Sequence, residues 1–138
     1  MTKISRLIFI AIAVSYGYGG LVHLANIAGF SGYNWLDAPP KWQVLDVVYL
    51  GLDFVVCVGL FRGWRSAATA FFVAGVSQIV LYTLGAHWVM DVPGEFLPSG
   101  HKMSLGSLVG FHFITLILMS YALWTRNSQT SAPEKTTN

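Results

Sequence analysis

Four blocks of mostly apolar residues, separated by shorter and more polar gaps, make up most of the chain. They cover residues 7–29, 42–61, 66–88 and 104–124, and each holds the roughly 20 residues that an α-helix needs to cross a bilayer. A transmembrane β-barrel would instead show alternating segments of roughly 10 residues, which are absent from this sequence. The pattern therefore predicts an all-α fold in which four transmembrane helices form an antiparallel bundle.

The gaps and the end of the chain set the expected domain organisation. The gap from Arg62 to Arg65 is so short that the flanking helices must form an antiparallel hairpin. After the fourth block the residues become small and polar, as in disordered tails. We therefore expect one transmembrane domain over residues 1–126 and a disordered polar tail over residues 127–138.

The basic residues of the gaps predict the orientation of the bundle. One side of the predicted membrane receives six of them (Lys3, Arg6, Arg62, Arg65, Arg126 and Lys135), and the other side receives Lys41 and Lys102. Cytoplasmic loops carry an excess of Lys and Arg. Both termini are therefore expected in the cytoplasm, and the location expected for the protein is a bacterial inner membrane.

Composition agrees with this location and excludes several functions. Hydrophobic residues make up 54% of the chain and charged residues 10%, which is too apolar for an ordinary soluble domain. The net charge of +2 and the lack of a Lys/Arg-rich run argue against a nucleic-acid partner. The sequence contains no nucleophile elbow, Walker loop or other hydrolase signature, so a hydrolase or kinase is disfavoured.

Candidate chemistry resides in a few polar side chains within the apolar blocks. Ionisable groups are costly in hydrocarbon, so they are rare there and usually functional. These residues are His23, Asp46, Asp53, Gln78, Tyr82 and His112. Counting the helical rise places His23, Asp46 and Tyr82 roughly 7 Å to the outer side of the membrane midplane. The same count places Asp53, Gln78 and His112 near the midplane. We expect them to face one interior and to form a polar pocket in the outer half of the bundle.

Several interpretations of this pocket remain open. Carboxylate and imidazole groups can relay protons or hydrogen-bond the oxygens of a quinone. Alternatively, His23 with Asp46, and Asp53 with His112, are interhelical hydrogen bonds worth about 0.6–2 kcal/mol each that hold the bundle together. The same four residues could also supply metal ligands, although no local ligand motif is present, so no metal site is predicted.

A second titratable set lies in the gap after the third block and at its edge. It comprises His87, Asp91, Glu95 and His101. These residues either gather ions or protons at the outer mouth of the bundle or are simply solvated, as most charged side chains are.

The run Gly19-Gly20-Leu21-Val22-His23-Leu24, together with the size and the four-span layout, resembles the DoxX-like group of small bacterial membrane proteins. That group includes a subunit associated with quinol oxidation. The resemblance therefore implies a link to respiratory or redox chemistry, and it assigns no catalytic residue.

Three functions follow from these observations. The first is an accessory or ligand-binding membrane subunit whose pocket holds a quinone-like or other lipid-soluble molecule. The second is a proton- or ion-coupled carrier of small solutes, which would act as an oligomer because four helices are few for a pathway. The third is a structural subunit of a larger membrane complex. The sequence does not identify the ligand or the oligomeric state.

Overall fold

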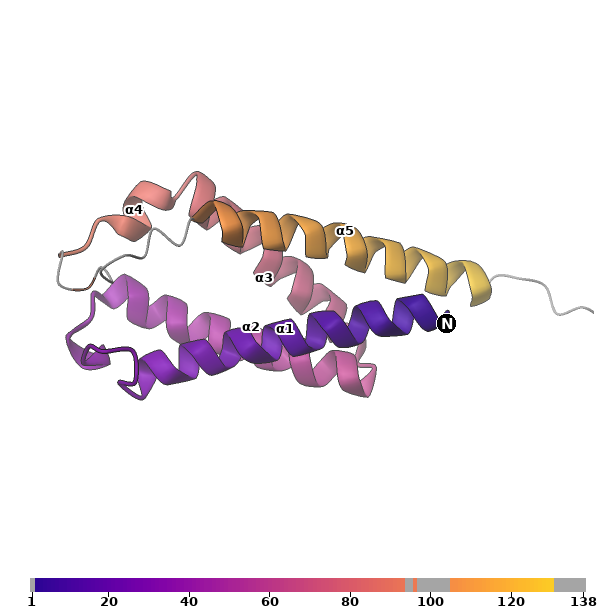
Figure 1. Cartoon of the computed structure of the whole chain (residues 1–138), viewed down its shortest axis with the longest axis horizontal. Coiled ribbons are helices and arrows are strands. Elements are labelled where there is room, and N and C mark those ends of the chain that lie inside the picture. Colours follow the sequence, from indigo (N-terminus) through magenta and orange to yellow (C-terminus); the bar gives the residue numbers. More distant parts are fainter. Residues whose placement is uncertain (1, 94–95, 97–104, 131–138) are drawn as a thin grey trace, which may run out of the picture.

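The computed structural model describes residues 2–93, 96 and 105–130, and all regular structure in these ranges is helical (Figure 1). The elements are α1 (Lys3–Ile27), the short 3-10 turn η1 (Trp35–Asp37), α2 (Pro40–Arg62), α3 (Arg65–Thr83), α4 (Ala86–Met90) and α5 (Leu105–Thr130). Within these ranges, α1, α2, α3 and α5 are long and apolar enough to cross a membrane. The predicted all-α bundle of four transmembrane helices is confirmed.

The four long helices form a ring in which each packs against two others. Helix α1 contacts α2 and α5, and α3 also contacts α2 and α5. Figure 1 shows that the start of α1, the α2–α3 turn and the end of α5 lie at one end of the molecule. We call this the inner end, and the opposite end, which carries η1 and α4, the outer end. Consecutive long helices therefore run antiparallel, as predicted.

The α2–α3 turn is a compact hairpin made possible by two glycines. Gly63 adopts the left-handed conformation (φ 70°), and the Trp64 N–H donates to the Gly59 carbonyl at 2.8 Å. This is the Schellman arrangement that commonly ends helices. A Cβ at Gly59 would lie 2.7 Å from the Cβ of Ala67. Glycine at that position therefore lets α2 and α3 approach closely.

Helix α3 is shorter than the expected span over residues 66–88. It ends at Thr83, and the separate helix α4 follows. At the break, the Gly85 N–H donates to the Val80 carbonyl at 3.1 Å, one residue beyond the α-helical partner Leu81. A Cβ on Gly85 would lie 2.8 Å from the Leu81 oxygen. Because glycine tolerates this close approach, the chain leaves the helix here rather than at Trp88.

Helix α5 is longer than expected at its end. It continues through residues 127–130, which we predicted to belong to the disordered tail. Adding residues to an existing helix costs far less than starting one, so polar residues can prolong it. The rest of that predicted tail, residues 131–138, lies outside the described residues.

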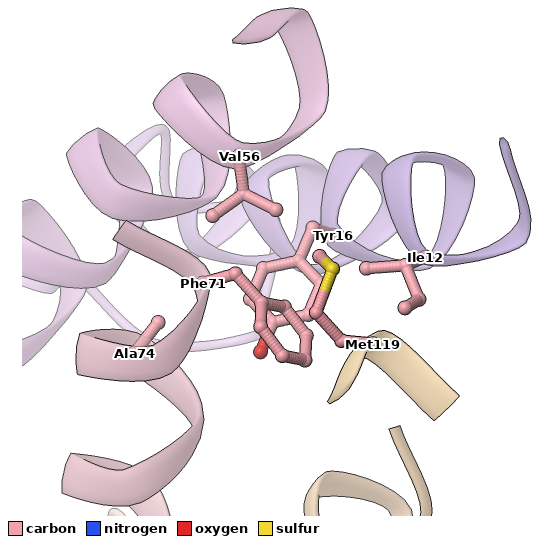
Figure 2. Close-up of a cluster of buried hydrophobic side chains, with 6 residues drawn as sticks. All are labelled: Ile12, Tyr16, Val56, Phe71, Ala74 and Met119. Atoms are coloured by element: carbon pink, nitrogen blue, oxygen red, sulfur yellow. The ribbon is translucent and has the colours of Figure 1, made fainter. Parts of the chain in front are cut away.

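The core and the exterior of the bundle are both apolar. Figure 2 shows a buried cluster supplied by all four long helices: Ile12 and Tyr16 from α1, Val56 from α2, Phe71 and Ala74 from α3, and Met119 from α5. Large apolar side chains also point outward, among them Leu7 (65% exposed) and Phe54 (62%). A water-soluble bundle would not present such faces, whereas lipid tails cover them at no cost.

Candidate polar interior

The outer part of the bundle interior is organised around the carboxylate of Asp46. Its Oδ1 lies 2.8 Å from Nδ1 of His23 and accepts a second hydrogen bond from the Asn26 amide at 3.0 Å. Its Oδ2 accepts a bond from the indole N–H of Trp35 at 3.0 Å. Asp46 is only 6% exposed. The anticipated contact between His23 and Asp46 is present, and we call these four residues the outer cluster.

Local structure explains how the outer cluster forms. His23 and Asn26 are three residues apart on α1 and therefore share a face. Trp35 is brought in by the η1 turn, which Gln43 fastens to α2. The Gln43 amide lies 3.2 Å from the Trp35 carbonyl, and it is also within hydrogen-bond distance of the carbonyls of Leu36 and Ala38.

Tyr33, in the loop before α2, packs with two other aromatic rings. The ring of Tyr33 lies 6.4 Å from that of Trp42 and 5.9 Å from that of Phe96, measured between ring centroids. Burial, with a smaller contribution from the charge of Asp46, raises the pKa of Tyr33 above its ordinary value of 10.0. Tyr33 therefore stays protonated at neutral pH and adds no second negative charge.

A second group of polar residues lies deeper, around the ring of His112. Its Nε2 lies 2.8 Å from Oε1 of Gln78, and its Nδ1 lies 3.4 Å from the hydroxyl of Tyr16. Because an amide oxygen can only accept, the proton belongs on Nε2, and Nδ1 of the neutral ring accepts the Tyr16 hydroxyl. We call these three residues the inner cluster. The alternative in which Asp53 bonds to His112 is wrong, since both nitrogens of His112 have other partners.

Asp53 lies between the two clusters and is bonded to neither. It is 3% exposed, and its Oδ1 is the buried side-chain oxygen or nitrogen that lacks a hydrogen-bond partner among the described residues. Electrostatic interactions connect Asp53 with His23 and with Tyr16. A Cβ at Gly19 would lie 2.6 Å from Asp53 Oδ2. The side chain therefore occupies the space left by a missing side chain on α1.

Two further tyrosines interact electrostatically with Asp53. The ring of Tyr49 stacks on His23 with centroids 5.9 Å apart, and its hydroxyl lies 3.0 Å from Oγ of Ser77. Tyr82 interacts electrostatically with Tyr49 and with the carboxylates of Asp46 and Asp53. The six candidate residues thus border one interior supplied by all four long helices. The two hydrogen bonds between candidates, His23 with Asp46 and Gln78 with His112, each join residues that we expected at the same depth.

The second titratable set is only partly described. His87 and Asp91 are exposed at the outer end, in and directly after α4, whereas Glu95 and His101 lie outside the described residues. Helix α4 is anchored through its backbone instead: Lys41 Nζ donates to the carbonyls of Trp88 at 2.5 Å and of Asp91 at 2.6 Å. The expected outer mouth remains a prediction.

Three contacts of the interior were not expected as site residues. Asn26 and Tyr16 were visible in the sequence as polar positions at helical spacing from His23, which was the available signal. Trp35 lies in the gap between the first two apolar blocks, and nothing in the sequence indicates that its N–H points inward. In the described part of the chain, no three His, Cys, Asp or Glu side chains gather as metal ligands.

Neither a protein-family model, nor a curated protein, nor a solved structure matches this chain. The fold and the site together describe a small multi-span membrane protein whose interior holds a buried polar network around His23, Asp46 and His112.

Proposed function

We propose that the protein binds a small amphipathic, quinone-like ligand in its polar interior, as an accessory or ligand-binding subunit of a bacterial inner membrane. The observation that carries this proposal is the unpartnered Oδ1 of Asp53. A buried acceptor without a donor is unfavourable by about 1–3 kcal/mol, and more when it is charged. A ligand hydroxyl that donates to this oxygen would recover that energy.

The surroundings of Asp53 suit such a ligand. A quinol offers hydroxyl donors for a carboxylate, and a quinone offers carbonyls for tyrosine or imidazole donors. Tyr49 and His23 interact electrostatically with Asp53 and supply such groups, whereas the hydroxyl of Tyr16 is already bonded to His112. Binding sites for small molecules typically combine an apolar lining with a few convergent polar groups.

The link to redox chemistry has a separate basis. It is supported by the four-span layout and by the run Gly19-Gly20-Leu21-Val22-His23-Leu24, through which the chain resembles the DoxX-like group. Nothing in the polar interior selects a quinone over another lipid-soluble molecule with hydroxyl or carbonyl groups. The proposed site therefore rests on Asp53, and the ligand's redox character rests on the resemblance.

The test is an inventory of the lipid-soluble molecules that copurify with the full chain in mild detergent. Asp53→Asn keeps the shape of the side chain but removes its charge, and His112→Ala removes the centre of the inner cluster. Loss of one charge-assisted hydrogen bond should lower the retained ligand by at least roughly tenfold. Asp91→Asn and His87→Ala are matched controls, because both residues are exposed; they should retain the ligand.

A wild-type protein without any retained hydroxyl- or carbonyl-bearing lipid, or equal retention by all four variants, would contradict the proposal. If retention is equal and proteoliposomes show a proton- or ion-driven solute flux that Asp53→Asn abolishes, the carrier is the correct function. Native mass spectrometry of the same sample would separate a homo-oligomer from a subunit of a larger membrane complex.

A further inference from the structure

Four arginines converge on one cavity at the inner end, far from the polar interior. The cavity has a volume of about 400 Å³, and Arg6 of α1, Arg62 and Arg65 of the α2–α3 turn and Arg126 of α5 all line it. Three separate segments of the chain thus deliver positive charge to one place. The preference for basic residues on the cytoplasmic side explains their presence at this end. It does not require that they share a cavity.

The arginines are held in place by buried contacts of their neighbours. Ser5, which is fully buried, bonds through its hydroxyl to that of Thr125 at 2.7 Å, and this contact joins α1 to α5 next to Arg6 and Arg126. The Schellman turn and the tight packing of Gly59 on Ala67 define the backbone of the turn that carries Arg62 and Arg65. The arrangement is therefore a built feature of the bundle.

No carboxylate neutralises these arginines within the described residues. The acidic side chains there are Asp37, Asp46, Asp53 and Asp91, which belong to the outer loops and the polar interior, and the ion pair formed in this part of the chain is His23–Asp46. Two of the guanidinium groups instead lie over aromatic rings, Arg62 over Trp64 and Arg126 over Phe9, each 6.0 Å from the centroid.

We propose that this cavity binds the phosphate head group of an anionic phospholipid, a site independent of the proposed ligand-binding function. Guanidinium groups bind phosphate oxygens through paired hydrogen bonds, and basic pockets between transmembrane helices hold acidic head groups. The remaining wall is apolar and includes Ile10 and Phe61, which are 38% and 58% exposed. Acyl chains can lie against such a wall, whereas a free phosphate gains nothing from it.

The experiment is native mass spectrometry of the full chain with added phosphatidylglycerol or phosphatidylcholine of identical acyl chains. The wild-type protein should bind phosphatidylglycerol preferentially. Arg62→Gln and Arg126→Gln should each lower that preference roughly fivefold, since one basic residue near a membrane surface contributes about that factor. Lys3→Gln removes one charge at the same end from an exposed residue that does not line the cavity, and it should leave the preference unchanged.

Equal binding of the two lipids by the wild-type protein, or an equal loss in Lys3→Gln and Arg126→Gln, would overturn the proposal. Displacement of the lipid by soluble glycerol phosphate at equal concentration would show that the cavity recognises phosphate alone. If phosphatidylglycerol were preferred only by the Glu134→Gln variant, the occupant of the cavity in the wild-type protein would be the chain's own tail rather than a lipid. None of these results depends on Asp53 or His112, so failure here leaves the proposed function untouched.

Discussion

At the scale of single residues, the contact between Gly19 and Asp53 explains most about the interior. Asp53 is buried beside a helix that carries no side chain at the point of approach, because a Cβ at Gly19 would lie 2.6 Å from its carboxylate. Gly20 also leaves room, since its Cβ would lie 3.4 Å from the Cβ of Asp53. The ionisable residue was recognisable from the sequence, because a charged group in an apolar block is conspicuous. The lack of a hydrogen-bond partner for its Oδ1 was not recognisable from the sequence.

Gly19→Ala should therefore destabilise the protein by about 1–3 kcal/mol, because the added methyl group overlaps the Asp53 carboxylate and forces a shift. Thermal unfolding in detergent measures this effect. Gly51→Ala is the matched control, since a Cβ at that position meets nothing within 4 Å; it should change stability by less than about 1 kcal/mol. In the Asp53→Ala background the Gly19→Ala penalty should shrink. A penalty of the same size in both backgrounds would contradict the proposed clash.

At the scale of elements, the lengths of helices follow from the bilayer, but their ends follow from local chemistry. The sequence predicted the hairpin between α2 and α3 because the gap from Arg62 to Arg65 allows no other connection. It did not predict the end of α3 at Thr83, because apolar residues continue beyond the break at Gly85. The length of an apolar block shows how far apolar residues continue along the chain. The end of α3 is set instead by backbone hydrogen bonds at the break.

Gly63→Ala tests the importance of the hairpin's backbone conformation. The φ of 70° at Gly63 is strained for a residue with a side chain, and a Cβ there meets no atom within 4 Å. The variant should therefore lose about 1–2 kcal/mol of stability through the backbone alone. Gly63→Asn should lose less, because asparagine tolerates the left-handed region. Thermal unfolding of both variants measures the difference, and equal losses would exclude the conformational explanation.

At the scale of the whole molecule, the bundle separates two chemically different ends. The inner end gathers the α2–α3 turn, the start of α1, the end of α5 and four arginines around one cavity. Asp46 lies toward the other end, where Trp35 of η1 donates to its carboxylate. The orientation in which the arginine-lined end faces the cytoplasm stays a prediction.

Cysteine labelling tests that orientation in the full chain. In a Cys57→Ser background, Leu36→Cys places a thiol on the η1 turn, where the native side chain is 75% exposed. Ser128→Cys places one near the end of α5, at the inner end. A membrane-impermeant maleimide should label the first variant in intact cells and the second only after permeabilisation. The reverse labelling pattern would show that the bundle has the opposite orientation. Labelling of both variants in intact cells would exclude the four-span topology.

The sequence by itself determined the number of spans, their antiparallel order and the few polar residues that lie within them. These properties follow from energies that act on each segment separately, namely the length needed to cross hydrocarbon and the cost of placing a polar group in it. Tertiary structure alone decided the partners: His112 bonds Gln78 and Tyr16, Trp35 turns inward to Asp46, and Asp53 has no hydrogen bond through Oδ1. Partners depend on how far each helix is rotated and how closely it approaches its neighbours. Those quantities are set by interlocking side chains and by the glycines that make room for them.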